Sequence, residues 1–182
     1  MRIVAGIWRG RVFAAPKGDT TRPTSDRVRQ ALFDMLAHAP WAGNRMIEGA
    51  HVLDAFAGSG GLGLEALSRG AAKAWFIEQD RIAAATIQAN IKGLAAMTRA
   101  VVIQADVLKP PRGHSCNLVF LDPPYARDLG PQAVAALRAA SWIAPGAIIV
   151  LEIGRDELMP ELGELLAERT HGAARVTIWR SA

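Results

Sequence analysis

The feature that most constrains the fold is an alternation of short apolar runs and longer amphipathic stretches from His51 onward. The apolar runs have the length and β-branched content of buried strands, and the stretches between them repeat apolar residues at helical spacing. This alternation predicts an α/β fold with a doubly wound, mostly parallel sheet and helices on both faces. The expected segments are His51–Phe56, Leu62–Ser68, Lys73–Ile77, Arg81–Met97, Ala100–Gln104, Cys116–Leu121, Leu129–Ala140, Ala147–Ile153 and a final helix over Asp156–Glu168.

The carboxyl end departs from this alternation. Strand-like segments near Leu165–Thr170 and Ala174–Arg180 flank His171 and Gly172. Two such runs around a short turn predict an antiparallel hairpin. We expect this hairpin to lie at one edge of the sheet.

The amino end also differs from the rest. Two short apolar runs flank Trp8-Arg-Gly-Arg11, where Gly10 can supply a positive φ, so we predict a basic β-hairpin. A helix is expected to begin after Thr24 or Ser25 as its N-cap and to end before Pro40. We therefore expect a hairpin and loop extension over residues 1–23 and a single α/β domain over residues 24–182.

Positive charge is concentrated at the amino end. Residues 1–29 hold seven Lys and Arg against two Asp, which is +5, whereas the whole chain carries +4, so the remainder carries −1. A basic end on a nearly neutral body indicates a polyanionic partner, most simply a nucleic acid, although a solvated basic face has the same composition. The predicted nucleic-acid contacts are Arg2, Trp8, Arg9, Arg11, Arg22, Arg27 and Arg29, with core packing as the alternative for Trp8.

Composition excludes several classes of protein. With 182 residues, 51% hydrophobic and 21% charged, the chain has the length of one folded domain and is neither disordered nor fibrous. Its longest uncharged stretch, Ala139–Leu151, is too short to span a membrane, and the first residues lack an apolar signal segment, so we expect a cytoplasmic protein. The four His show no metal-ligand spacing and Cys116 stands alone, so no metal site is expected.

A glycine-rich turn follows the first strand of the alternation. Gly58, Gly60 and Gly63 match the pattern G-x-G-x-x-G between a strand and a helix, which is typical of a nucleotide-like cofactor site. Asp54, at the end of the strand, would repel a pyrophosphate but would attract the ammonium and sulfonium groups of S-adenosylmethionine. The turn therefore favours S-adenosylmethionine over a dinucleotide.

Carboxylates recur at or just past the ends of the expected strands, at Asp54, Glu78, Asp106 and Asp122. In a doubly wound sheet these ends line one crevice. Our hypothesis is that Glu78 accepts hydrogen bonds from the ribose hydroxyls, that Asp106 accepts from the adenine amino group, and that the glycines approach the methionine part. Each acid alone has a simpler interpretation as a helix cap or a solvated loop residue. The predicted cofactor site comprises Asp54, Phe56, Gly58, Ser59, Gly60, Glu78 and Asp106.

The strand expected over Cys116–Leu121 ends in Asp122-Pro-Pro-Tyr125. The two prolines stiffen the backbone and lack N–H donors, so Asp122 and the carbonyl of Pro123 can both accept hydrogen bonds from one amino group. The ring of Tyr125 offers a face on which a heterocycle can stack. The exocyclic amino group of a nucleobase fits such a pocket, and a plain turn off a strand is the alternative. Asp122, Pro123, Pro124 and Tyr125 are the predicted catalytic residues.

These motifs carry a resemblance to a known family. Asp54-Ala-Phe-Ala-Gly-Ser-Gly60 and Asp122-Pro-Pro-Tyr125 resemble class I, Rossmann-like S-adenosylmethionine-dependent methyltransferases that modify exocyclic amino groups. Arg2-Ile-Val-Ala-Gly-Ile-Trp-Arg-Gly-Arg11, Arg22-Pro-Thr-Ser-Asp-Arg-Val-Arg29 and Leu62-Gly-Leu-Glu-Ala-Leu-Ser-Arg69 resemble the RsmD family. The resemblance implies transfer of a methyl group to guanine N2 in 16S ribosomal RNA, at guanine 966. It implies S-adenosylmethionine as the cofactor and the RNA or the assembling small ribosomal subunit as the partner.

Three other functions stay open at this point. A DNA amino-methyltransferase acting on adenine N6 or cytosine N4 would share the core motifs, although no separate region has the size usually needed to read a DNA sequence. A nicotinamide-dependent oxidoreductase would use the glycine turn but would explain neither Asp54 nor Asp122. A non-catalytic RNA-binding protein on the same scaffold would use the basic end alone.

Overall fold

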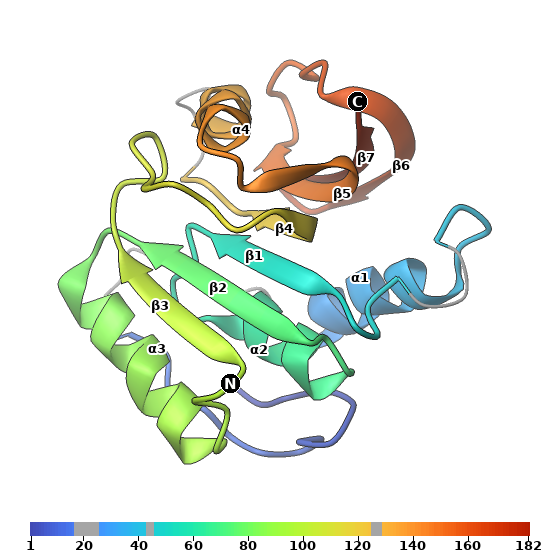
Figure 1. Ribbon diagram of the computed structural model, residues 1–182. Coiled ribbons are helices and arrows are strands. Elements are labelled where there is room, and N and C mark those ends of the chain that lie inside the picture. Colours follow the sequence, from blue (N-terminus) through green and yellow to red (C-terminus); the bar gives the residue numbers. More distant parts are fainter. Residues whose placement is uncertain (17–25, 43–45, 125–128) are drawn as a thin grey trace.

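The computed structural model describes residues 1–16, 26–42, 46–124 and 129–182. These residues form a seven-stranded sheet with the strand order β3-β2-β1-β4-β5-β7-β6 (Figure 1). The strands β1 to β5 are parallel, and β7 is antiparallel to both of its neighbours. The elements are α1 (Asp26–His38), β1 (His51–Ala55), α2 (Gly61–Ser68), β2 (Lys73–Glu78), α3 (Arg81–Gly93), β3 (Ala100–Gln104), β4 (Cys116–Leu121), α4 (Leu129–Ala139), β5 (Ile143–Gly154), β6 (Gly163–His171) and β7 (Ala174–Ser181).

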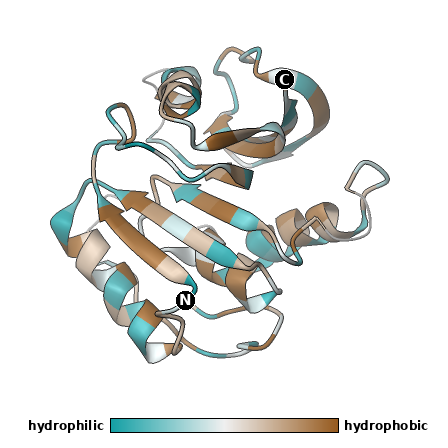
Figure 2. Cartoon of the chain, viewed as in Figure 1, coloured by the Kyte–Doolittle hydropathy of each residue, from teal (hydrophilic) through white to brown (hydrophobic). Residues whose placement is uncertain are grey.

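The predicted α/β fold is confirmed, because the alternation from His51 forms a parallel sheet with a hairpin of β6 and β7 at its edge. Parallel strands buried on both faces need apolar residues at successive positions, which is why β1, β2 and β4 read as almost continuous apolar runs. One face packs against α1, α2 and α3, and the other packs against α4 and the segment that precedes β4 (Figure 2). None of the helices in the described ranges is long and apolar enough to cross a lipid bilayer.

The prediction of a helix over Asp156–Glu168 is wrong. The chain forms a turn and an irregular segment after β5, and the second half of that range belongs to β6. Leu162 is buried, whereas Leu158 is 90% exposed, so the leucines four residues apart do not form one buried helical stripe. Pro160 lacks a backbone donor and Gly163 has a φ of +140°, and both features oppose a continuous helix.

Residues 1–16, the amino-terminal segment, reverse direction as predicted, but they form a single antiparallel bridge between Arg2 and Val12 instead of regular strands. Two backbone N–H groups of the segment, at Val4 and Ala5, donate to the Glu65 carboxylate on α2 at 2.8 and 3.0 Å. The side chains of Ile3, Trp8 and Phe13 are buried in the cluster formed with α1, α2 and α3. The segment therefore packs on the helices that cover this face of the sheet. The expected N-cap residues Thr24 and Ser25 lie outside the described residues.

Candidate active site

The acidic residues gather where the chain changes direction across the sheet. From β1 the chain moves outward through β2 to β3, and then returns to place β4 on the other side of β1. The carboxyl ends of β1 and β4 are therefore neighbours, with Asp54 opposite Phe120 and Ala55 opposite Leu121. Asp122 directly follows Leu121 and lies close enough to Asp54 for the two carboxylates to repel each other. Such a topological switch point is where ligands bind in open α/β sheets.

Asp54 is buried, with 3% of its surface exposed. Its Oδ2 accepts a hydrogen bond from the backbone N–H of Gly63, in the first turn of α2, at 2.8 Å. Burial raises the pKa of Asp54 to about 8, the bond from Gly63 opposes that rise, and the negative charges of Asp122 and Glu78 add to it. A positive charge at this place would favour the ionised carboxylate and would lower the pKa again.

The glycine turn between β1 and α2 depends on backbone conformations that favour glycine. Gly58 and Gly60 have φ values of +54° and +76°. Position 63 requires glycine for a different reason, since a Cβ there would lie 2.3 Å from Cε1 of Phe76. Phe56, which is half-buried, also has a positive φ of +61°, and Ser59 is half-buried in the same turn.

The two other predicted cofactor acids both hold backbone N–H groups. The oxygens of Glu78, at the carboxyl end of β2, accept from Gly58 at 2.7 Å and from Asp80 at 2.8 Å. Asp106 is exposed, and its Oδ1 accepts from Leu108 at 2.9 Å. Glu78 therefore fixes the glycine turn directly, and Asp106 fixes the turn that follows β3. A carboxylate oxygen has more than one lone pair, so these bonds leave acceptor capacity for a ligand.

The Asp-Pro-Pro corner follows β4 directly. Asp122 is half-buried, Pro123 is buried and Pro124 is exposed. Burial raises the pKa of Asp122 to about 7, and the negative charge of Glu152 contributes to the rise. Tyr125 lies outside the described residues.

Glu152 was not predicted as a site residue. It lies near the carboxyl end of β5, one residue past Leu151, which pairs with Leu121. Asp122 and Glu152 both line a cavity of about 10 Å³ among side chains of α1, α2 and β7, which is room for about one water molecule. The signal in the sequence is an acid that interrupts an apolar strand at the edge where Asp54 and Asp122 lie.

Known proteins resemble this chain along its whole length. The family model described as conserved hypothetical protein 95 matches residues 1–180. The ribosomal RNA small subunit methyltransferase D of Haemophilus influenzae is 38% identical over 188 residues, covering 100% of this chain and 94% of the relative. This chain belongs to that family, the RsmD family.

Two further relatives of the RsmD family agree. The ribosomal RNA small subunit methyltransferase D of Escherichia coli K12 is 43% identical over 156 residues, covering 84% of this chain and 74% of the relative. The solved structure of the putative methyltransferase yhhF from Escherichia coli has a TM-score of 0.85 at 37% identity, covering 100% of this chain and 98% of that chain. The similarity therefore extends over the sheet and the amino-terminal segment alike.

The basic residues of this RsmD-family chain divide into exposed and buried ones. Arg9, Arg11 and Arg27 are exposed, and Arg2 is exposed while its Nε donates to Asp26 at 3.0 Å. Arg22 lies outside the described residues. The exposed guanidinium groups are placed where a polyanion can reach them.

Two of the predicted nucleic-acid contacts are not available at the surface. Arg29 is fully buried, where it donates to Asp26 at 2.8 Å and lies 3.5 Å from Glu65. Trp8 is 8% exposed and packs in the core with the guanidinium of Arg99 over its ring. For Trp8 the structure shows the alternative, core packing, and for Arg29 the prediction of an exposed contact was wrong. Charge and aromatic character do not tell whether a residue anchors the segment or faces solvent.

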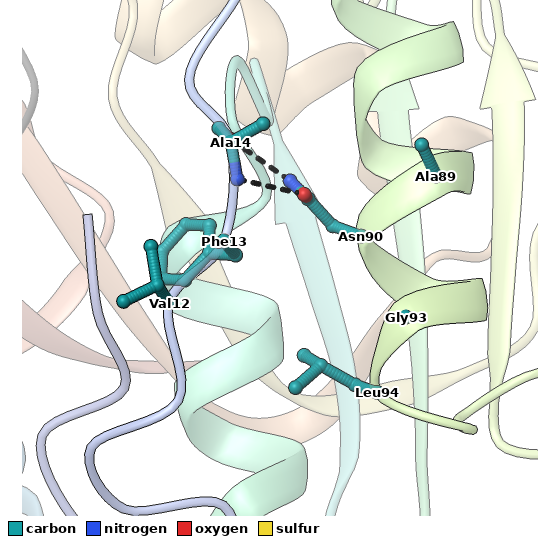
Figure 3. Close-up of a pocket in the computed structure, with 7 residues that line it drawn as sticks. All are labelled: Val12, Phe13, Ala14, Ala89, Asn90, Gly93 and Leu94. Atoms are coloured by element: carbon teal, nitrogen blue, oxygen red, sulfur yellow. Dashed lines mark hydrogen bonds between the residues drawn. The ribbon is translucent and has the colours of Figure 1, made fainter.

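A larger hollow of about 300 Å³ lies between the amino-terminal segment and α3 (Figure 3). It is lined by Val12, Phe13, Ala14, Ala89, Asn90, Gly93 and Leu94. Among the described residues, no group of three or more His, Cys, Asp or Glu is arranged to hold a metal ion.

Proposed function

We propose that this chain binds S-adenosylmethionine and transfers its methyl group to the N2 amino group of a guanine in 16S ribosomal RNA, at guanine 966 by family resemblance. The observation that carries the proposal is the neighbouring position of Asp54 and Asp122 at the switch point between β1 and β4, in a member of the RsmD family. An acidic crevice beside a rigid proline corner suits a cationic donor next to a neutral amine.

The residues of the crevice fit the donor. Asp54 is buried beside other acids, so a ligand with an ammonium and a sulfonium group supplies the positive charge that favours its ionised form. Gly58 and Gly60 carry no side chain that would keep a ligand away from the backbone. S-adenosylmethionine supplies an electrophilic methyl group on sulfur. In this proposal Glu78 accepts hydrogen bonds from the ribose and Asp106 accepts from the adenine amino group, while both carboxylates also accept from backbone N–H groups of the turns in which they lie.

The Asp122 corner would orient the amine. The guanine amino group is a poor nucleophile because its lone pair is delocalised into the ring. Acceptors at Asp122 and at the Pro123 carbonyl would hold its two hydrogens and direct the lone pair at the methyl group, so placement and electrostatics provide the rate. The target base must leave its stack, and a ring at Tyr125 would return about 1–3 kcal/mol by stacking. The raised pKa of Asp122, about 7, supports this carboxylate as the acceptor of the proton that the nitrogen loses.

Donor binding is expected to release protons. In the free protein Asp54, with a pKa of about 8, is mostly protonated at neutral pH, and a cationic donor lowers that pKa. Affinity for S-adenosylmethionine should therefore rise from pH 5.5 to 7.5, by up to about tenfold per pH unit. Calorimetry in two buffers of different ionisation enthalpy measures the released protons directly.

Asp54→Asn provides the matched variant for this measurement, because its amide oxygen can still accept from Gly63. It should weaken donor binding and release fewer protons on binding, because only Asp122, whose pKa is also raised, could then lose a proton to solvent. The folded-state pKa of Asp54 lies above the unfolded value of 3.8, so this group lowers the free energy of unfolding as pH rises from about 4 to 8. The variant should thus be at least as stable as the parent at pH 7.5. Donor binding by the parent without any proton release would contradict the role given to Asp54.

Reversing the charge of Arg9 and Arg11 together should weaken binding to ribosomal RNA about 100-fold or more at low salt. Both side chains are exposed, and removing one phosphate interaction reduces the slope of log affinity against log salt by roughly 0.7 to 0.9. The measurement is RNA affinity over a range of salt concentrations. The control is Arg112→Glu with Arg169→Glu, which makes the same change of charge on exposed residues elsewhere. An equal decrease of affinity in the two double variants would mean that only the net charge of the protein matters, and that Arg9 and Arg11 make no specific contact with RNA.

The experiment that tests the function is transfer of labelled methyl from S-adenosylmethionine to deproteinised 16S ribosomal RNA, to small subunits and to duplex DNA, followed by nucleoside identification. We expect N2-methylguanosine from an RNA substrate, mapping to guanine 966. Label in N6-methyladenine or N4-methylcytosine of DNA would replace the proposal by a DNA amino-methyltransferase. Donor binding without transfer to any of them would favour a binding protein.

A further inference from the structure

One side chain joins the amino-terminal segment to the glycine turn. Asn90 on α3 is 6% exposed, and its amide forms two hydrogen bonds with Ala14, one to the backbone N–H and one to the carbonyl, both 2.9 Å long (Figure 3). The Nδ2 of the same amide also lies 3.3 Å from the carbonyl of Ser59, between Gly58 and Gly60. Asn90 therefore bonds simultaneously to the segment and to the turn.

The segment also packs directly behind the turn. A Cβ built on Gly61, the first residue of α2, would lie 3.3 Å from Cε of Met1 and 3.6 Å from Cζ of Phe13. The guanidinium of Arg11 donates to the carbonyl of Gly93 at the end of α3, at 2.7 Å. The segment is thus joined to α2, which begins at the glycine turn, and to α3, through the Asn90 amide, the packing of Met1 and Phe13, and the Arg11 guanidinium.

We propose that Asn90 is a positioning residue that couples the two ligands of this protein, so that nucleic acid bound to the amino-terminal segment strengthens donor binding at the glycine turn, and the donor strengthens nucleic-acid binding. The inference rests on the proposed function and adds to it an energetic coupling between the donor site and the nucleic-acid site, although each site could bind its ligand without that coupling. Asn90 touches neither reacting group and acts through Ala14 and Ser59.

The physical basis is shared ordering. A ligand that fixes the glycine turn also fixes the carbonyl of Ser59 and hence the amide that holds Ala14. A second ligand that binds the segment then loses less conformational entropy, because the segment is already ordered. The two ligands thus strengthen each other's binding without a large change of shape. Coupling between two binding sites is reciprocal, and its usual size is about 5- to 150-fold in affinity.

The test is a binding cycle with S-adenosylhomocysteine, which cannot donate a methyl group, and with small ribosomal subunits or deproteinised 16S ribosomal RNA. The affinity for S-adenosylhomocysteine is measured with and without saturating RNA, and the RNA affinity with and without S-adenosylhomocysteine. We expect each ligand to strengthen the binding of the other about tenfold in the parent chain. In Asn90→Ala the coupling factor should fall to within about twofold of one.

Two further variants separate positioning from stability. Asn90→Asp keeps an acceptor for the Ala14 N–H but cannot donate to Ala14 and Ser59, so it should also lose the coupling. Asn117→Ala is the control, since the Asn117 amide accepts from the His51 N–H at 2.8 Å at the amino ends of β1 and β4. It should keep the coupling factor of the parent.

A measurement on the parent chain requires no variant. Hydrogen exchange at the Ala14 N–H should slow severalfold when S-adenosylhomocysteine binds. Absence of coupling in the parent, unchanged exchange at Ala14, or full coupling in Asn90→Ala would overturn the inference. Failure of the parent to bind either ligand would instead contradict the proposed function.

Discussion

Asp122→Ala is expected to reduce the rate of methyl transfer about 100- to 1,000-fold, while the affinity for S-adenosylmethionine stays within a few fold of the parent. The variant lacks the acceptor that holds and orients the amine, and removing one such preorganised group has effects of this size. The donor interactions proposed for Asp54, Glu78 and Asp106 remain. Single-turnover transfer to ribosomal RNA, with donor affinity measured separately by calorimetry, checks both parts.

Asp122→Asn refines this test because it keeps the shape of the side chain and removes the charge. The folded-state pKa of Asp122, about 7, lies above its unfolded value of 3.8, so the ionised group lowers the free energy of unfolding as pH rises across that window. The Asn variant should therefore unfold at no lower temperature than the parent at pH 7.5. Asp156→Ala, a change at an exposed acid after β5, serves as the control. Transfer at near-parental rates in both Asp122 variants would exclude the role proposed for this residue.

The fold was predictable wherever local pattern and tertiary environment agree. The strands β1, β2 and β4 are buried almost throughout and are apolar along most of their length. β4 has the predicted bounds, and so does the edge strand β3, which is only partly buried. The helix expected over Asp156–Glu168 failed because its apolar residues are divided between the core and solvent. Spacing in the sequence does not record which of two apolar residues finds a partner in the folded chain.

The candidate site was predictable to the extent that it depends on strand ends. Parallel strands bring their carboxyl ends to one edge, so acids at those ends were expected to share a crevice, and Asp54 and Asp122 are neighbours there. Glu152 lies near the carboxyl end of β5, as Asp54 does in β1, but it was missed because no glycine-rich turn or proline corner follows it in the sequence. The burial of Arg29 and its contact with Glu65 depend on how α1 meets α2, which no local pattern contains.

A second large effect is expected at Gly6, which joins backbone conformation to a close contact. Its φ is +82°, and a Cβ there would lie 1.9 Å from the carbonyl oxygen of Ser68. That carbonyl accepts from the Ile7 N–H at 2.8 Å, and the hydroxyl of the same serine accepts from the Trp8 N–H at 3.0 Å. A side chain at residue 6 would thus push the amino-terminal segment away from α2 and break the bonds that hold it.

Gly6→Ala should lower the free energy of unfolding by about 3 kcal/mol or more, because the positive φ alone costs roughly 1–2 kcal/mol and the broken hydrogen bonds add about 1 kcal/mol each. Gly10→Ala is a matched control, since Gly10 has a φ of +83° and nothing within 4 Å of an added Cβ. It should show the backbone cost alone.

Urea unfolding and ribosomal RNA affinity, measured on both variants, compare the two sites. If the segment binds RNA only when it is seated on α2, Gly6→Ala loses RNA affinity and Gly10→Ala retains most of it. An equal decrease in both variants would mean that the conformation of the turn, and not its packing on Ser68, governs binding.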